Sequence, residues 1–272
     1  MKEVIVLIPI YKNFLEEYEL KSLEINISNL NSYEVVFIAP NSLKTDYLFL
    51  NILLNFKLDV VYFDDSFFRN IKGYNKLMLN YGFYKYFSDY NYILICQLDA
   101  LVLSNNLDYW ISKDFDYIGA PFICEEGDSY FFNSMGNGGL SLRKVAKFLE
   151  ILDSKSIFYS NYKFFSISLR AGLKYILFIK LLKRLNQIGI KLKVNIFLSF
   201  FNSNEDYFWS FYAKFFVNDF RIPSANEALL FSFEVNPRKC FSLTNNQLPF
   251  GCHAWQKYDR KFWEEVYPYL KS

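Results

Sequence analysis

The sequence has little of what keeps a chain from packing a core, with only 10 Gly and 7 Pro among its 272 residues. Hydrophobic residues make up 52% of the chain and aromatic residues 21%, including 31 Phe and 22 Tyr. This much apolar surface offsets the entropy cost of ordering a chain. The composition therefore excludes a disordered protein, a collagen-like repeat and a chain made mostly of linkers. The length suits one large domain or two small ones.

Paired cysteines and long hydrophobic runs are also missing. The four Cys residues form no C-x-x-C pair, and a chain of this length does not need disulfides to fold, so we expect a reduced, intracellular protein. The apolar run at residues 4–10 is too short for a signal peptide and has no small-residue cleavage site. No stretch reaches the roughly 18 uncharged apolar residues of a membrane-spanning helix. We therefore expect a protein that is soluble or membrane-associated and does not span the bilayer.

Acidic residues are absent from residues 154–204, which contain nine Lys or Arg and no Asp or Glu. This segment carries a charge of +9 and the rest of the chain −7, although the net charge is only +2. On a helical wheel, the basic residues of 170–184 lie mostly opposite an apolar side. A basic amphipathic helix of this kind binds anionic membranes, at about 1 kcal/mol per basic residue near the surface. The alternative is a core-facing helix with a solvated cationic face. Nucleic acid is not an expected partner, because the one basic segment is hydrophobic.

The first hundred residues alternate between strand-like and helix-like patterns. Apolar runs predict four strands, at residues 4–9, 34–39, 60–63 and 92–96. Helical spacing of apolar residues predicts helices between them, including 46–55 and 75–87. The alternation predicts an α/β fold with a Rossmann-like, mostly parallel central sheet flanked by helices. Ligands bind beyond the carboxyl ends of the strands in such sheets, so we expect residues 9–11, 64–65 and 97–99 to share one edge.

The second half of the chain is less regular. Residues 116–121 predict a short strand and a turn, and the glycine-rich turn 136–139 precedes a predicted strand and a helix that ends at Leu152. Asn204 is the expected N-cap of a helix that runs to Phe216. A last helix is expected at about 259–270.

Four features of the sequence together resemble a known enzyme class. They are, in order, Gln97-Leu98-Asp99, Gly136-Asn137-Gly138-Gly139, Asn204-Glu205-Asp206 and His253. The set resembles the GT-A nucleotide-sugar glycosyltransferases, especially inverting enzymes similar to the β-1,4-galactosyltransferases. Residues 116–121 and 248–255 also resemble a related family of largely uncharacterised microbial proteins. The resemblance implies one GT-A domain over 1–272, with a nucleotide-binding half at 1–103 and an acceptor half at 104–272 that carries the basic helical insertion at 154–204.

The resemblance implies a divalent cation, Mn²⁺ or Mg²⁺, held by Asp99 and His253. A departing diphosphate needs its charge neutralised, hard cations prefer oxygen ligands, and Mn²⁺ also accepts imidazole. Gln97 departs from the family, which has an acid at this position, and a Gln contributes no charge to a metal site. The ordinary alternatives are a strand-end Asp that caps a turn and a lone His with satisfied hydrogen bonds.

The resemblance assigns the catalytic carboxylates to Glu205 and Asp206. Neighbours on a helix project about 100° apart, so the two are expected to do different jobs. We expect Asp206 to be the general base that deprotonates the acceptor hydroxyl and Glu205 to orient the acceptor. The alternative is acidic charge that complements the helix dipole.

The remaining site residues are expected around the donor and the sugar. Gly138 and Gly139 are expected to line the donor sugar and the acceptor, and Trp209 and Trp255 to contact a sugar. The nucleotide is expected to contact the following residues: Pro9, Tyr11, Asp64, Asn75, Lys76 and Gln97.

The expected function is a metal-dependent inverting glycosyltransferase in surface polysaccharide synthesis. It would move a sugar from a nucleoside diphosphate sugar, with UDP as the expected nucleotide, to a glycan or polyprenyl-linked acceptor, and residues 154–204 would contact the inner face of the membrane. Two other hypotheses are an inactive transferase fold that binds membranes and a metal-dependent phosphoesterase or nucleotidyltransferase. The balance of 23 Lys against 7 Arg fits an AT-rich bacterial genome.

Overall fold

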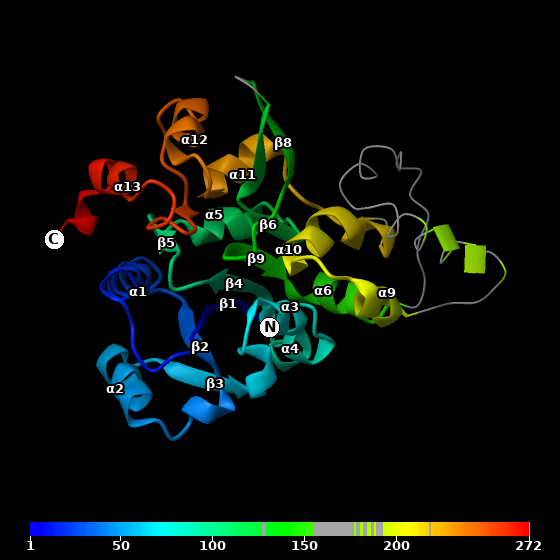
Figure 1. The fold of residues 1–272 in the computed structure, drawn as a ribbon, viewed down its shortest axis with the longest axis horizontal. Helices are drawn as coiled ribbons and strands as arrows, with labels where there is room; N and C mark the ends of the chain where they lie inside the picture. The colour runs from blue at the N-terminus through cyan, green and yellow to red at the C-terminus, as the bar shows by residue number, and fades with distance from the viewer. Residues whose placement is uncertain are drawn as a thin grey trace.

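The computed structural model of the chain (Figure 1) describes residues 1–126, 129–154, 193–217 and 219–271, together with six single positions between 177 and 188. For residues 124–126 and 129–135 it describes the backbone alone. The expected basic helix within residues 154–204 therefore falls largely outside the described residues. None of the helices in the described parts is long and apolar enough to cross a membrane.

A six-stranded sheet forms the centre of the molecule, in the order β3-β2-β1-β4-β9-β6. Its strands are β1 (Lys2–Pro9), β2 (Glu34–Pro40), β3 (Asp59–Phe63), β4 (Tyr90–Cys96), β6 (Tyr117–Gly119) and β9 (Leu140–Lys144). Strands β1 to β4 pair in parallel, and β9 runs antiparallel between β4 and β6. The predicted α/β class and the mostly parallel sheet are confirmed, and the four strands begin and end within two residues of the predicted limits.

Both faces of this sheet are buried, which explains the continuous apolar runs in the sequence. Ile5 and Leu7 of β1 pack into one core with Phe148 and Trp209, whereas Val6 and Ile8 pack into a second core with Phe49. Figure 1 shows α1 (Glu17–Asn29) and α2 (Tyr47–Phe56) on one side of the sheet, and α3 (Ile71–Met78), α4 (Tyr81–Tyr86) and α6 (Val145–Leu152) on the other.

The expected helix over residues 75–87 is wrong, because the segment forms two helices. Asn70 caps α3 by accepting a hydrogen bond from the Gly73 N–H. Asn80 interrupts the helix and caps α4, since its side chain accepts from the Phe83 N–H at 3.2 Å. An Asn inside a helical pattern competes for backbone hydrogen bonds in this way.

The second half of the chain adds two small sheets and several short helices. A three-stranded sheet consists of β10 (Ser232–Phe233), β11 (Gly251–Cys252) and β5 (Leu101–Val102), and β7 (Pro121–Glu126) forms a hairpin with β8 (Ser129–Met135). Within the residues that the structure describes, the remaining α-helices are α5 (Leu107–Ser112), α9 (Val194–Phe200), α10 (Glu205–Tyr207), α11 (Ala225–Phe231), α12 (Pro237–Leu243) and α13 (Arg260–Val266). Pro268 starts a separate 3₁₀ turn, so the last helix is shorter than expected.

The expected helix up to Phe216 is irregular in the structure. Helix α10 passes into a π-helix at Phe208–Tyr212 and then into a 3₁₀ turn at Ala213–Phe215. A π-helical turn rotates the side chains that flank it relative to a regular helix, and such turns often occur at functional sites. Here the irregular turn directly follows the two acids of α10.

Candidate active site

The expected site lies where the order of the strands changes direction. Strand β1 has β2 on one side and β4 on the other, and sheets of this topology bind ligands beyond the carboxyl ends of the strands at such a point. Gln97 follows β4 directly, and its backbone N–H donates to the Gly139 carbonyl at 2.9 Å. This hydrogen bond places the glycine-rich turn beside Gln97 and Asp99.

The short strand pair β5–β11 brings Asp99 and His253 together. Cys252 pairs with Leu101 in antiparallel register, so the residues just beyond this pair, on the site side, are Asp99 and His253. The imidazole Nε2 lies 3.3 Å from Asp99 Oδ1 and 3.1 Å from Gln97 Oε1. Residues separated by 154 positions in the sequence therefore form one polar cluster.

Glu234 completes this cluster and was not expected from the sequence. Its Oε1 lies 3.0 Å from His253 Nδ1, and its Oε2 accepts a hydrogen bond from Asn137 Nδ2 at 2.8 Å. The parallel register of β10 and β11 explains its position, because it pairs Phe233 with Cys252 and therefore places Glu234 beside His253. We call Gln97, Asp99, Glu234 and His253 the His253 cluster.

The charges in the His253 cluster stabilise one another. Burial alone would lower the pKa of His253, but its hydrogen bonds with Asp99 and Glu234 raise that pKa to about 10. Burial alone would raise the pKa of Asp99, but the hydrogen bond with His253 lowers it below its usual value. Without another cation, the cluster therefore holds an imidazolium between two carboxylates at neutral pH.

At Gly138 and Gly139, the space that a side chain would need is occupied by Glu205 and His253. A Cβ on Gly139 would lie 2.1 Å from His253 Nε2, and one on Gly138 would lie 2.3 Å from Glu205 Oε1. Any larger residue would displace the imidazole or the carboxylate. The close approach explains these two glycines by packing alone, and a contact with a sugar remains a prediction.

Glu205 forms a buried ion pair with Arg143 of β9. Its Oε1 accepts from Arg143 Nη2 at 2.8 Å and its Oε2 from Nη1 at 3.2 Å. Arg143 also donates to the hydroxyls of Ser141 and Tyr84 at 3.0 Å each. Both its oxygens accept from Arg143 and its side chain is buried, so the described contacts give Glu205 a structural role, and the expectation that it orients the acceptor stays a prediction.

Asp206 is buried as well, but its hydrogen-bond partners differ from those of Glu205. Its side chain is only 8% exposed, its Oδ1 accepts from the Tyr207 N–H at 2.8 Å, and within the described residues no cationic side chain forms an ion pair with it. Burial, together with the nearby charges of Glu205 and Glu234, raises the pKa of Asp206 to about 7. Burial raises the pKa of Glu205 as well, against the opposing effect of Arg143, so the two acids differ in their partners, and the pKa of Asp206 lies close to neutral pH.

Asn75 connects α3 to the start of α10. Its Nδ2 donates to Asn204 Oδ1 at 3.2 Å, and its Oδ1 accepts from the Glu205 N–H at 3.2 Å. Asn204 stands at the N-cap position, as expected, but its side chain makes no capping hydrogen bond. Since both ends of its amide bind the start of α10, Asn75 positions this turn, and its expected contact with the nucleotide stays a prediction.

The other expected nucleotide contacts lie around the same edge. Pro9 is buried at the end of β1, and Tyr11 is exposed beyond it. Asp64 instead caps the turn at Asp65–Phe67, where its Oδ1 accepts from the backbone N–H and the hydroxyl of Ser66. Lys76 lies on the exposed side of α3. Of these residues, Asp64 has a structural role in the described contacts.

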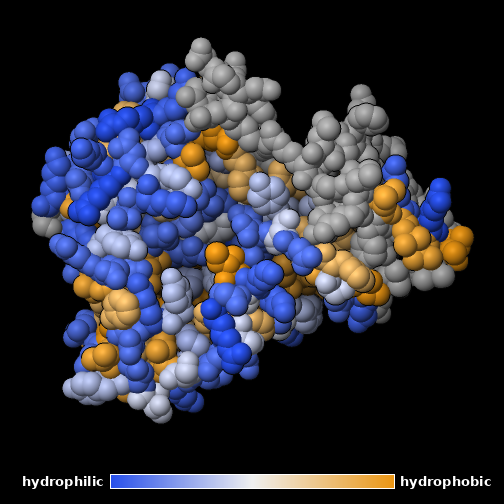
Figure 2. Space-filling view, in the orientation of Figure 1, coloured by the Kyte–Doolittle hydropathy of each residue, from blue (hydrophilic) through white to orange (hydrophobic). Residues whose placement is uncertain are grey.

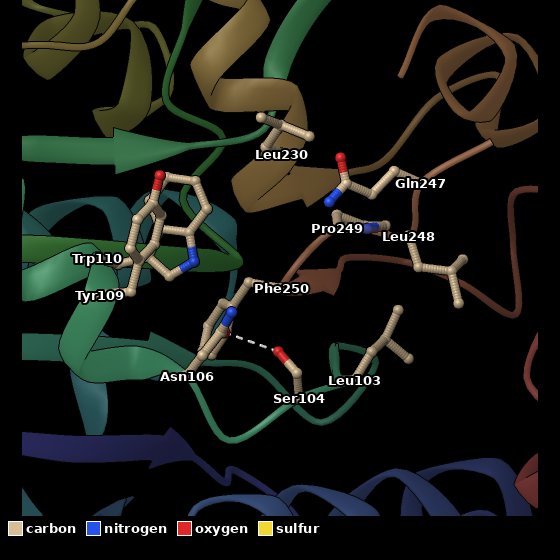
Figure 3. Close-up of a pocket in the computed structure, with 10 residues that line it drawn as sticks. All are labelled: Leu103, Ser104, Asn106, Tyr109, Trp110, Leu230, Gln247, Leu248, Pro249 and Phe250. Carbon is tan, nitrogen blue, oxygen red and sulfur yellow. Dashed lines mark hydrogen bonds between the residues drawn. The ribbon is translucent and has the colours of Figure 1, made fainter. Parts of the chain in front are cut away.

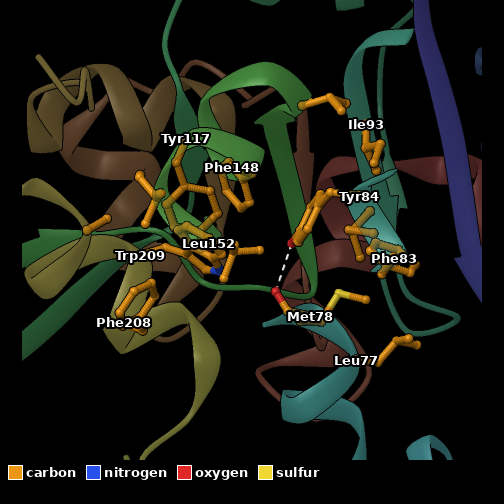
Figure 4. Close-up of a cluster of buried hydrophobic side chains, with 14 of the residues drawn as sticks. Leu77, Met78, Phe83, Tyr84, Ile93, Tyr117, Phe148, Leu152, Phe208 and Trp209 are labelled. Carbon is orange, nitrogen blue, oxygen red and sulfur yellow. Dashed lines mark hydrogen bonds between the residues drawn. The ribbon is translucent and has the colours of Figure 1, made fainter. Parts of the chain in front are cut away.

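The two tryptophans expected to contact a sugar are core residues, so this expectation is wrong. Trp209 is fully buried and stacks on Phe148 with ring centroids 3.8 Å apart, as Figure 4 shows beside Tyr84. Trp255 is buried as well, and its Nε1 donates to Ser22 Oγ at 2.9 Å. Neither indole has a ring face open to a ligand.

Tyr74 is a further residue that the sequence did not single out. Its hydroxyl is buried and has no hydrogen-bond partner of ordinary length among the described residues. Burial raises the pKa of Tyr74 to about 12, against the opposing effects of Arg143 and Gln97. Gln97 lowers this pKa through a side-chain hydrogen bond, so the Tyr74 hydroxyl lies beside the Gln97 side chain.

Comparison with known proteins identifies a family. Residues 57–253 match the model of a protein family of unknown function, DUF5672. The chain belongs to this family. None of the curated proteins matches the chain significantly. The match spans all of the His253 cluster and both acids of α10, so the site described above lies within the part of the chain that defines a DUF5672 protein.

Several solved structures resemble this DUF5672 protein at low sequence identity. The galactosyltransferase LgtC, in complex with donor and acceptor sugar analogs, is 12% identical with a TM-score of 0.45, over 98% of this chain and 95% of its own. Mouse xyloside xylosyltransferase 1 is 10% identical with a TM-score of 0.46, over 92% and 97%. The 4-diphosphocytidyl-2C-methyl-D-erythritol synthase of Anaerococcus prevotii is 11% identical with a TM-score of 0.35, over 59% and 80%. Glycosyltransferases are thus among the structures that the chain resembles, but scores below 0.5 do not identify a function.

The His253 cluster can be tested for its fit to a divalent cation. Ligand atoms about 2.1 Å from one octahedral cation lie about 3 Å from each other. Asp99 Oδ1 and Gln97 Oε1 lie 3.3 and 3.1 Å from His253 Nε2, close to that separation. Glu234 binds the other ring nitrogen, as carboxylates commonly do behind a metal-bound His. The donor set therefore fits a cation.

The protein alone supplies only part of a coordination shell. Within the described residues, no group of three or more His, Cys, Asp and Glu side chains could hold a metal ion. Mg²⁺ and similar cations are often bound by one or two carboxylates together with the phosphates of a substrate. The cluster therefore fits a cation that binds together with a phosphorylated ligand better than a permanently bound metal.

The raised pKa of Asp206 predicts a pH-dependent effect on stability. The carboxyl is protonated up to about pH 7 in the folded protein but only up to about pH 4 in the unfolded chain. Its contribution to folding is therefore complete at low pH and is lost as the pH rises through 7. We expect the free energy of unfolding of the wild type, relative to Asp206→Asn, to fall by on the order of 4 kcal/mol between pH 4 and pH 8.

Urea unfolding at a series of pH values measures this difference. Glu24→Gln is the matched control, since Glu24 is exposed, and its unfolding free energy should follow that of the wild type at every pH. Parallel wild-type and Asp206→Asn curves across the whole range would show that Asp206 titrates normally.

Proposed function

We propose that this protein is an inverting glycosyltransferase that moves a sugar from a nucleoside diphosphate sugar, with UDP as the nucleotide, to a hydroxyl of a glycan or polyprenyl-linked acceptor. The observation that carries the proposal is that the site combines two groups with different chemistry. The His253 cluster is suited to a cation and a diphosphate, and Asp206, whose pKa is raised in part by Glu234 of that cluster, is suited to take a proton. Sugar transfer from a nucleotide needs both.

The donor would bind at the carboxyl edge between β1 and β4. Asp99, His253 and the amide oxygen of Gln97 would hold Mn²⁺ or Mg²⁺, and such an ion, when bound, neutralises the charge of a departing diphosphate. Glu234 keeps the imidazole oriented through Nδ1. The Tyr74 hydroxyl beside Gln97 would donate a hydrogen bond to the donor.

Asp206 would act on the acceptor. In the proposed reaction its carboxylate accepts the proton of the acceptor hydroxyl, the hydroxyl oxygen forms a bond to the anomeric carbon, and the bond from that carbon to the diphosphate oxygen breaks. Attack from the face opposite the diphosphate inverts the anomeric configuration. A base with a pKa of about 7 is largely ionised in the neutral to mildly alkaline range, where such a step would be fastest.

The ion pair of Glu205 with Arg143 would position this base. The ion pair holds the Glu205 side chain against β9, and Asn75 of α3 accepts a hydrogen bond from the Glu205 backbone N–H. Both contacts hold α10 without using Asp206 itself. The carboxylate of the base is therefore left to face the acceptor in a largely dry environment, where proton transfer is sensitive to its orientation.

The variant Asp206→Asn tests the proposed reaction. We expect it to release UDP from its sugar at least a hundredfold more slowly than the wild type, because an amide cannot accept the proton, while its affinity for UDP with Mn²⁺ stays within about threefold. The assay measures UDP released from UDP-glucose, UDP-galactose and UDP-N-acetylglucosamine with Mn²⁺, with neutral glycosides as acceptors. Glu24→Gln is the control and should keep wild-type turnover. If Asp206→Asn turned over as fast as the wild type, Asp206 would be excluded as the base. If neither the wild type nor the variants released UDP from any of the three donors, an inactive transferase fold would be favoured.

We also propose that residues 154–204 contact an anionic membrane surface, where a polyprenyl-linked acceptor would lie. Leu177, Leu181 and Ile188 are each more than half exposed, and Lys180 and Arg184 are exposed among them. Figure 2 shows hydrophobic and hydrophilic residues together at the end of the molecule that carries α9 in Figure 1. Exposed leucines among basic residues are typical of helices that lie in a membrane interface.

Charge reversal tests the membrane contact. Lys180→Glu with Arg184→Glu removes two basic residues, each worth about 1 kcal/mol near an anionic surface, so we expect binding to phosphatidylglycerol-containing vesicles to weaken at least tenfold in co-sedimentation. Lys44→Glu with Lys57→Glu changes the charge equally on either side of α2, where both residues are exposed, and should leave binding unchanged. Equal sedimentation of both double variants would point to the core-helix alternative.

A further inference from the structure

A pocket lies on the molecule away from the His253 cluster. It has a volume of about 270 Å³ and is enclosed by the residues that follow β5, by α5 and by the segment that leads into β11. Figure 3 shows its lining residues, which come from these elements and from Leu230 of α11. The volume is near the lower end for small-molecule sites and suits one or two sugar rings better than a nucleotide sugar.

The pocket and the His253 cluster lie at opposite ends of the same pair of short strands. Asp99 precedes β5 and His253 follows β11, whereas Leu103 follows β5 and Phe250 precedes β11. The Leu103 N–H donates to the Phe250 carbonyl at 2.8 Å, which closes the pair at the pocket end. The pocket is therefore separate from the proposed transfer site and is built on the same rigid element.

Trp110 gives the pocket an unsatisfied hydrogen-bond donor. Its side chain is only 4% exposed, and its Nε1–H is buried with no hydrogen-bond partner among the described residues. Figure 3 shows the indole nitrogen on the side of the ring that faces the other lining residues. A buried N–H without a partner costs about 1–3 kcal/mol, so a ligand with an acceptor oxygen at this place would be favoured.

The rest of the lining combines polar groups with an aromatic wall. Ser104 Oγ donates to Asn106 Oδ1 at 2.7 Å, which orients the Asn106 amide, and Gln247 adds an exposed amide on the other side. Tyr109, 49% exposed, and Phe250 supply apolar surface. Amides and hydroxyls both donate and accept hydrogen bonds, so the pocket can match groups of either kind.

The absence of charge in the lining decides the class of ligand. None of the ten lining residues is Asp, Glu, Lys, Arg or His, so a phosphate or carboxylate would be desolvated there without a counter-charge. A purely apolar ligand would leave the Trp110 N–H and the amides unpaired. A neutral sugar ring has a C–H face for the aromatic wall and hydroxyl groups for the polar side chains.

We propose that this pocket binds a neutral sugar unit of a glycan. That this glycan is the acceptor, held at a point away from the transfer site, rests on the function proposed above. The binding itself does not rest on it, because it needs neither a donor nor a cation. The two proposals can therefore fail separately.

Saturation-transfer NMR on the full chain tests the pocket, with the methyl glycosides of glucose, galactose and N-acetylglucosamine and the disaccharide maltose as probes. We expect at least one of them to bind the wild type, and its affinity to fall at least fivefold in Tyr109→Ala and in Trp110→Phe, which keeps an aromatic side chain but removes the indole N–H. Tyr81→Ala is the matched control, since Tyr81 is similarly exposed, at 44%, on another helix. It should bind as the wild type does, and so should Asp206→Asn.

Three results would overturn the proposal. One is that none of the four probes binds the wild type. Another is equal binding by Tyr109→Ala, which changes an exposed side chain and so tests the pocket even if Trp110→Phe folds poorly. The third is binding that Asp206→Asn abolishes and Tyr109→Ala does not, which would place the sugar at the transfer site. Sugar binding at this pocket in a protein that releases no UDP would leave the pocket proposal standing and contradict the transferase.

Discussion

His253 is held through one ring nitrogen by Glu234 and faces Asp99 and Gln97 with the other, and the surrounding fold is arranged to keep it there. Its backbone N–H donates to the Phe233 carbonyl, so its position depends on the pairing of β10 with β11. Gly139 leaves the space that the ring fills. An imidazole between two carboxylates, largely removed from water, is costly to assemble and is stable only because each group is paired.

A second buried interaction holds the other half of the site. The ion pair of Arg143 with Glu205 joins the central sheet to α10, and the Tyr84 hydroxyl links Arg143 to α4 while donating to the Met78 carbonyl of α3. Removing one partner of such a pair leaves an uncompensated buried charge, which typically costs 3–5 kcal/mol. This constraint separates the roles of the two neighbouring acids: Glu205 is bound to the framework, and Asp206 keeps its carboxylate available.

The central strands could be predicted from the sequence because a sheet buried on both faces needs uninterrupted apolar runs, and residues 4–9 and 92–96 are such runs. The break between α3 and α4 was missed, although Asn80 is a good N-cap, because the apolar spacing continues across it. The proximity of Asp99 and His253 was expected from the resemblance to the GT-A enzymes. Glu234 and Arg143 were not, since their roles arise from strand register and from a partner 62 residues away. Trp209 was misplaced because spacing alone does not distinguish a core aromatic residue from a ligand-binding one in a chain with 31 Phe.

The central claim is that the His253 cluster binds a divalent cation together with a nucleoside diphosphate. Calorimetric titration of UDP into the wild type, with Mn²⁺ and then with EDTA, measures this coupling directly. The account predicts that Mn²⁺ strengthens UDP binding at least tenfold, and that His253→Gln loses this gain while it still binds UDP weakly. The same affinity for UDP with Mn²⁺ and with EDTA, or no UDP binding in either condition, would contradict it.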